Sequence, residues 1–68
     1  MWDPSTNQLA LLRAIRDGRW HDLDYVRIRC VRRTALALKA REALFFEGNR
    51  VKIASKGTAL LVQYPEKP

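Results

Sequence analysis

The 68-residue sequence is poor in the residues that enzymes and metal proteins use. It has one histidine (His21), one cysteine (Cys30) and only two serines, at positions 5 and 55. A nucleophile with its base and orienting group would have to be assembled from these few side chains. His21 beside Asp22 and Asp24 does not supply the ligand count of a specific metal site. The three glycines form no phosphate-binding loop. We therefore expect no enzyme, no cofactor, no metal and no small-molecule substrate.

Long apolar runs and a second cysteine are also absent. No apolar run approaches the ~20 residues that a membrane span requires. The N-terminal residues lack the charged-then-apolar layout of a signal peptide. A single cysteine cannot form an internal disulfide, which fits a reducing interior. These absences predict a cytoplasmic protein without membrane contact.

Positive charge is what the sequence has in excess. Thirteen Lys and Arg residues stand against seven Asp and Glu residues, which gives a net charge of +6. Residues 27–56 carry nine basic and two acidic residues, hence +7 (nine minus two), and the remainder carries −1. Such a concentration of one sign is typical of phosphate binding. The alternative is an arginine-rich protein with solvated faces, which would not explain the nearly neutral N-terminal third.

The first part of the chain predicts a helix over residues 4–17. Asp3, or as second choice Ser5, can cap it, and a proline suits its first turn. Apolar residues at positions 9, 12 and 15 follow helical spacing. Asp17-Gly18 is the expected end, because glycine readily takes the left-handed conformation after the last turn. With 47% hydrophobic residues, the chain is long enough for one small domain.

The second half of the chain predicts a β-hairpin over residues 44–54. Two apolar runs flank Gly48-Asn49, and the second run alternates as Arg-Val-Lys-Ile. This is the pattern of two strands joined by a tight turn, with a cationic outer face. Ser55 is the expected N-cap of a short helix over 55–63. A tail over 64–68, rich in proline, should sustain neither helix nor strand.

The order of these segments resembles a known family. A first helix that ends in glycine is followed by GRWHDLDYV, a basic segment, the hairpin and IASKGTALL, all within residues 8–62. This resembles the small winged helix-turn-helix regulators of archaea and bacteria. Many of them have a Gly-x-Trp-His-x-Leu entry to the second helix and a Leu-Thr-x-Lys-Gly-x-x-Leu-Leu closing segment. The resemblance implies an α+β winged helix-turn-helix fold, with a three-helix core, a C-terminal β-hairpin wing and a short final helix.

Residues 25–33 allow two interpretations. Asp22 and Leu23 begin a helix well, and the resemblance places a second helix over 22–30. However, apolar residues at 26, 28 and 30 alternate with Arg27 and Arg29, which is a strand pattern. A strand here would give a mixed sheet with two flanking helices. We favour the helix, and the strand stays the alternative.

The resemblance places the recognition helix over residues 32–44. The face expected to pack on the first helix comprises Leu36, Ala40, Ala43 and Leu44. In helix-turn-helix docking, the N-terminal half of this helix enters the major groove, where arginine bonds guanine in a bidentate manner. The hairpin tip would lie near the minor groove or the adjacent backbone. The expected DNA-binding residues are Arg27, Arg29, Arg32, Arg33, Thr34, Lys39, Arg41, Asn49, Arg50, Lys52 and Lys56.

These expectations together predict sequence-preferring binding of double-stranded DNA by a small transcriptional regulator. A homodimer is expected, because one such module offers a modest footprint on DNA. A protein–protein interaction module within a nucleic-acid-associated complex is one alternative, and exposed Leu38, Phe46 or Tyr64 in one patch would favour it. RNA or ribosome binding is another, because a basic surface is equally suitable for it.

Overall fold

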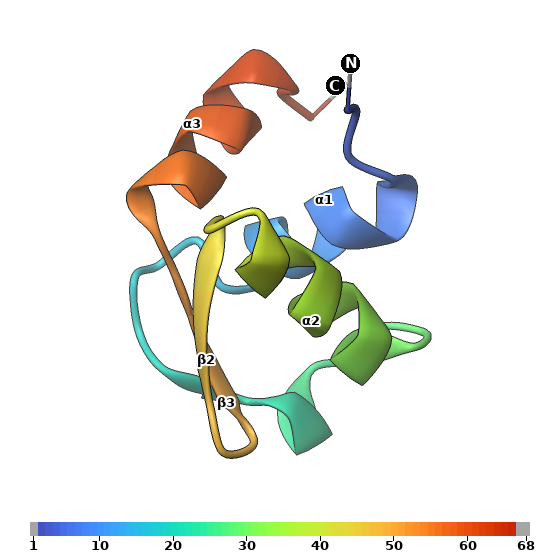
Figure 1. Cartoon of the computed structure of the whole chain (residues 1–68), viewed down its shortest axis with the longest axis vertical. Helices are drawn as coiled ribbons and strands as arrows, with labels where there is room; N and C mark the ends of the chain where they lie inside the picture. The colour runs from blue at the N-terminus through green and yellow to red at the C-terminus, as the bar shows by residue number, and fades with distance from the viewer. Residues whose placement is uncertain (1, 67–68) are drawn as a thin grey trace.

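The computed structural model of the chain describes residues 2–66. Within them it has three α-helices and three short strands, an α+β arrangement (Figure 1). In chain order the elements are α1 (Thr6–Ala14), β1 (His21–Asp22), the 3₁₀ turn η1 (Leu23–Tyr25), α2 (Val31–Ala40), β2 (Leu44–Glu47), β3 (Arg50–Ile53) and α3 (Ser55–Gln63). The strands form one antiparallel sheet in the order β1-β3-β2. None of the described helices is both long and apolar enough to cross a membrane.

The core lies where α1, α2 and the inner face of the sheet meet. Its fully buried side chains are Leu11, Leu12, Ile15, Leu38 and Val51. Two of the three apolar positions predicted for the first helix, 12 and 15, are therefore in the core. Burial of such side chains contributes roughly 1.5–3 kcal/mol each, which is the main stabilisation available to a domain of this size.

α3 packs closely on the rest of the domain at Gly57, which is buried. A β-carbon at this position would overlap the backbone oxygen of Ala43 and lie 2.8 Å from Ile53 Cγ1 and 3.0 Å from Leu12 Cδ2. Glycine therefore allows the backbone of α3 to lie directly against the end of the hairpin. The glycine of the closing segment thus has a packing role.

α1 is shorter than predicted at both ends. Its N-cap is Ser5, whose hydroxyl accepts the N–H of Gln8 (3.1 Å), while the Gln8 side chain accepts the N–H of Ser5 (2.8 Å). Asp3, the first choice, is not the cap, because this reciprocal pair satisfies two free N–H groups at once. The helix ends at Ala14, and turns follow it up to Gly18, which has a φ of 80°.

The predicted hairpin and final helix are present. β2 and β3 pair from Leu44 opposite Ile53 to Glu47 opposite Arg50, so Gly48-Asn49 is a two-residue turn. Gly48 has a φ of 60° whereas Asn49 does not have a positive φ, as in a type II′ turn. α3 spans 55–63 as predicted, but its N-cap is Ala54 rather than Ser55. Residues 67 and 68 of the expected tail lie outside the described residues.

The predicted second helix over 22–30 is absent, and this corrects the expected architecture. Asp22 ends strand β1 and caps the single 3₁₀ turn η1, accepting the N–H of Asp24 (2.8 Å). Residues 26–28 form neither helix nor strand, although Val26 and Ile28 are partly buried and Arg27 is exposed. Two helices, not three, therefore precede the hairpin, and the third follows it. The expected three-helix core followed by a wing is wrong in this respect.

α2 spans 31–40 instead of the predicted 32–44, because the chain reverses at Arg41 and Glu42. The N–H of Glu42 bonds the oxygen of Lys39 and the N–H of Ala43 bonds the oxygen of Leu38, both at 2.9 Å. Glu42 has a left-handed φ of 60°. This is a Schellman motif, which satisfies the last carbonyl groups of a helix.

The buried face of α2 differs from the predicted one. Thr34, Ala35 and Leu38 face the core, whereas Leu36 is 53% exposed. Ala43 is buried as predicted, but it lies after the helix and not on its face. The face that α2 presents to solvent is therefore rotated relative to the expectation.

Candidate nucleic-acid interface

The structure leaves ten of the eleven predicted DNA-binding residues at least partly exposed. The exception is Thr34, which is 7% exposed and packs in the core. Its side chain therefore does not offer a contact to a base edge. The exposed positions of α2 are instead Arg32, Arg33, Leu36, Lys39 and Ala40. Arg32, Leu36 and Lys39 follow the i, i+4, i+7 spacing of one helix row.

The cations of residues 27–56 are almost all without a carboxylate partner. Among residues 2–66, the only ion pair that this block makes is Lys56 Nζ with Glu42 Oε2, at 3.0 Å. Within the same part of the chain, no carboxylate lies within ion-pair distance of the other eight, which are Arg27, Arg29, Arg32, Arg33, Lys39, Arg41, Arg50 and Lys52. Their positive charge is therefore directed to solvent or to a ligand.

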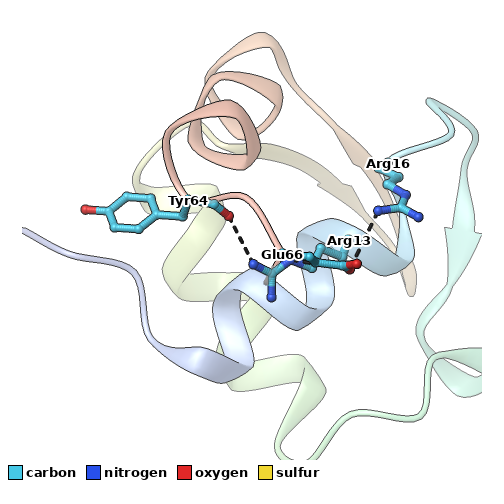
Figure 2. A network of polar contacts seen from close by, with 4 residues as sticks. All are labelled: Arg13, Arg16, Tyr64 and Glu66. Atoms are coloured by element: carbon cyan, nitrogen blue, oxygen red, sulfur yellow. Dashed lines mark hydrogen bonds and ion pairs between the residues drawn. The ribbon is translucent and has the colours of Figure 1, made fainter. Parts of the chain in front are cut away.

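Arg13 of α1 and Arg16, in the turn that follows α1, differ in this respect. Arg13 and Arg16 converge on one carboxylate, with Arg13 Nε and Arg16 Nη1 each 3.6 Å from Glu66 Oε1 (Figure 2). Arg13 also donates to the backbone oxygen of Tyr64 (3.0 Å). Both arginines thus have a carboxylate partner, which they share, whereas eight of the nine cations of residues 27–56 have none among residues 2–66.

Asn49 joins three separate elements at the tip of the hairpin. Its Nδ2 donates to Asp22 Oδ1 (2.8 Å), and its Oδ1 accepts from Arg32 Nη2 (2.5 Å). Its backbone oxygen accepts the N–H of Leu23 (2.8 Å). The hairpin tip, η1 and the N-terminal turn of α2 are therefore held together. Consequently, the cations at the start of α2 and those on the hairpin are held in a fixed position relative to one another.

This role of Asn49 was not predicted. The sequence indicates an asparagine after glycine as part of a turn, and Asn49 was expected to contact DNA directly. Both polar groups of its side chain already have partners within the protein. It therefore acts first as a link between elements, and the cations around it remain the candidates for direct contact.

Two of the predicted arginines also lie over aromatic rings. The guanidinium carbon of Arg32 is 5.9 Å from the ring centroid of Phe46, and that of Arg41 is 4.5 Å from the ring centroid of Trp2. Arg32 is at the N-terminal end of α2 and Arg41 is just beyond its C-terminal end, roughly 14 Å away along the axis at 1.5 Å per residue. The structure therefore does not gather all the predicted residues at one point. Arg41 and Lys56 lie at the end away from the hairpin tip.

The groups with a shifted pKa lie outside this surface. The ring of His21 hydrogen-bonds Asp17 Oδ1 (2.7 Å), and this bond, with the N–H of Arg19, lowers the pKa of Asp17 below its ordinary 3.8. The hydroxyl of Tyr64 donates to Asp3 Oδ1 (2.6 Å), and the acceptor carboxylate raises the pKa of Tyr64 above 10.0. Neither pair includes a predicted DNA-binding residue.

Residues 2–66 contain no group of three or more His, Cys, Asp or Glu side chains placed to hold a metal ion. Comparison of the chain with models of protein families, with curated proteins and with solved structures gives no match. A functional conclusion therefore rests on the charge and geometry of the surface described above.

Proposed function

We propose that this protein binds double-stranded DNA with a sequence preference, through α2 and the β2–β3 hairpin, and acts as a small transcriptional regulator. The observation that carries the proposal is the set of eight cations without carboxylate partners on α2, its flanking turns and the hairpin. Neutralisation of phosphates by such side chains supplies most of the affinity of a DNA-binding protein.

The proposed fold is a winged helix in which the turn η1 stands in place of the second helix. Its support is the order of helix, short strand, turn, helix and hairpin. In this arrangement α2 enters the major groove and the hairpin lies along the neighbouring backbone. The bonds of Asn49 to Asp22 and Arg32 would fix the angle between these two parts.

The exposed row on α2 defines the proposed contacts to bases. Arg32 and Arg33 are in its first turn, where the helix N-terminus also favours a phosphate. Leu36, 53% exposed, would contact a thymine methyl group, which major-groove readers recognise through apolar side chains. Lys39 follows one turn later. The hairpin residues Arg50 and Lys52, together with the cations that precede α2, would contact phosphates.

The test measures the affinity for duplex DNA as a function of salt. If about six of the eight cations contact phosphates, the logarithm of the binding constant should fall with the logarithm of salt concentration with a slope of about −5. The double substitution Arg32→Ala and Arg33→Ala should reduce this slope by about 2 and weaken specific binding, without loss of the fold. Fluorescence anisotropy of a labelled duplex gives both quantities.

Arg13→Ala with Arg16→Ala is the matched control. This double variant also removes two positive charges, but from side chains that are paired with Glu66. The salt slope should therefore stay as in the wild type. Equal losses in the two double variants would mean that net charge alone drives binding and would contradict a defined interface. Preference for structured RNA in competition would contradict the DNA assignment.

Two further aspects of the proposal concern partners. We propose that the protein binds DNA as a homodimer, and light scattering at micromolar concentration measures its mass. An interaction patch of Leu38, Phe46 and Tyr64 has no support, because Leu38 is fully buried and the other two are only partly exposed.

A further inference from the structure

The outer face of the sheet carries exposed aromatic and basic side chains. Val51 and Ile53 of β3 are buried, so the alternation of a strand turns Arg50 and Lys52 to the opposite, outer face. In β2, Phe45 is paired with Lys52 and is 55% exposed. These residues belong to the face that points away from α1 and α2.

Trp20 extends this face on the other side of β3. His21 is paired with Val51, and continuing that register by one residue places Trp20 beside Lys52. Trp20 is 40% exposed, and it lines a hollow of about 180 Å³ together with Glu47 and Arg50, which belong to the same outer face. Lys52 of β3 and Phe45 of β2 thus lie in one row with Trp20, which directly precedes β1, so that a cation stands between two exposed aromatic rings.

We infer that this row binds single-stranded DNA, with bases stacked on Trp20 and Phe45 and a phosphate at Lys52. Exposed aromatic rings beside cations are the features that hold single strands, because every base has a π-face and every nucleotide a negative charge. Lys52 has no carboxylate partner among residues 2–66, so it is available to a phosphate. A duplex keeps its bases stacked and would not use these rings.

The acidic groups on the same face restrict where the strand lies. Asp22 and Glu47 flank Arg50 in the neighbouring row of the sheet. Asp22 accepts hydrogen bonds from Asn49 and from the N–H of Asp24, and Glu47 is opposite Arg50. The neighbouring row therefore carries two carboxylates and one guanidinium, a net charge of −1, which directs the phosphates to the row that contains Lys52.

The choice of DNA over RNA rests on the proposed function. Base stacking and a phosphate contact do not distinguish DNA from RNA, so the row itself does not select either sugar. Arg32 at the start of α2 is bonded to Asn49 at the hairpin tip, so the proposed duplex surface adjoins the sheet. An unpaired strand that leaves a duplex bound to α2 would therefore reach the outer face.

The experiment measures the binding of an oligothymidylate at low salt. In a Trp2→Phe background Trp20 is the only tryptophan, and stacking of a base on it should quench its fluorescence. Phe45→Leu keeps an apolar side chain but removes the ring, and should raise the Kd between about 5-fold and 150-fold. Phe45→Tyr keeps the ring and should bind as the wild type does.

Tyr25→Leu is the matched control, because Tyr25 is an aromatic residue, 86% exposed, that lies outside the sheet in η1. It should not change the affinity, and circular dichroism of each variant confirms that the fold is kept. Three results would each overturn the inference: no quenching of Trp20, equal affinity of Phe45→Leu and wild type, or binding of oligouridylate but not of oligothymidylate.

The same variants separate this inference from the proposed function. Arg32→Ala with Arg33→Ala should weaken duplex binding and leave the oligothymidylate affinity within about 3-fold, because those residues lie on α2. Intact oligothymidylate binding by a protein that ignores duplex DNA would overturn only the proposed function. The opposite pattern would overturn only the single-strand site.

Discussion

Substitution of Gly57 by alanine tests the packing of α3 on the rest of the domain. The new methyl group would overlap the backbone oxygen of Ala43 and crowd Ile53 and Leu12. The Ala43 oxygen cannot easily move, because it accepts the N–H of Ala54 (3.0 Å) and Ala43 is fully buried. The helix α3 would have to shift outward and lose contact with α1.

The size of the effect follows from two opposing terms. Overfilling a packed core costs about 1–3 kcal/mol, and the upper end applies here because the atom in contact belongs to the backbone. Alanine is preferred over glycine inside a helix by about 1 kcal/mol, which offsets part of this loss. We therefore expect Gly57→Ala to lower the free energy of unfolding by about 2 kcal/mol. For a domain of this length, that corresponds to a decrease in Tm of about 8–16 °C.

Urea unfolding followed by circular dichroism measures this difference. The control is Thr58→Ala, at the next position of α3, where the side chain is exposed. It gains helix propensity without a clash and should raise the free energy of unfolding by a few tenths of a kcal/mol. If Gly57→Ala were as stable as the wild type, α3 would not pack against Ala43 as described, and the reasoning would be refuted.

Two further predictions concern a turn and a carboxylate. Glu42→Gly should have a free energy of unfolding about 1 kcal/mol higher than Glu42→Ala, because only glycine adopts the left-handed φ of this position without strain. Both variants lose the ion pair with Lys56, so the ion pair does not contribute to the difference. Equal urea midpoints of the two variants would show that the backbone at Glu42 is not strained. Hydrogen bonds from His21 and Arg19 lower the folded pKa of Asp17 below 3.8, so its carboxylate stabilises the fold above that pH, and this contribution is lost as the pH falls through the folded pKa. Asp17→Asn should therefore lower the urea midpoint at about pH 6, and the difference from the wild type should shrink as the pH falls below 3.8; a loss that is the same at every pH would refute the assignment.

The hairpin and α3 could be predicted because their signals are local. Gly48-Asn49 with alternating residues on one side specifies a two-residue turn, and the register observed is the one that this turn dictates. The end of α2 could not be predicted in the same way. Its left-handed position is occupied by Glu42 rather than glycine, so the sequence gives no stop.

The absence of a helix-stop signal in the sequence also explains why the buried face of α2 differs from the predicted one. In a helix that extends to residue 44, as predicted, Ala43 and Leu44 belong to the apolar face together with Leu36. In the shorter helix the inward-facing set is the partly buried Val31 with the buried Thr34, Ala35 and Leu38, at i, i+3, i+4 and i+7. Leu38, which the predicted apolar face did not include, is fully buried in the core.

The segment 22–30 had signals for two structures and adopts neither in full. Asp22 does act as a cap, but only for one 3₁₀ turn. The alternation of partly buried Val26 and Ile28 with exposed Arg27 belongs to a segment without a partner strand, in which the N–H of Ile28 bonds the oxygen of Val26 (3.1 Å). Alternating apolar and charged residues predict which side chains are buried. They do not predict whether the segment pairs with a strand, because that depends on which strands lie nearby in the fold.

For the candidate interface, the charged block could be predicted and its internal links could not. Asn49 bonds residues that are 17 and 27 positions away along the chain, and neither spacing belongs to a repeating pattern. Likewise, the pairing of Arg13 and Arg16 with Glu66 depends on how the last residues return to α1. Composition indicates where the charge is, and only the fold shows which charges are already satisfied.

The bond between Arg32 and Asn49 has a consequence for how a ligand would be recognised. A long, flexible side chain normally loses conformational freedom when it is immobilised by a partner, at a cost of about 0.5–1.5 kcal/mol. Arg32 is already confined by the amide of Asn49 and the ring of Phe46 before any ligand arrives. Most of that entropy loss would therefore occur during folding, before the guanidinium binds a phosphate or a base. Discrimination between ligands would then depend on how well each ligand matches the fixed position of the guanidinium, because the side chain would not rearrange to suit the ligand.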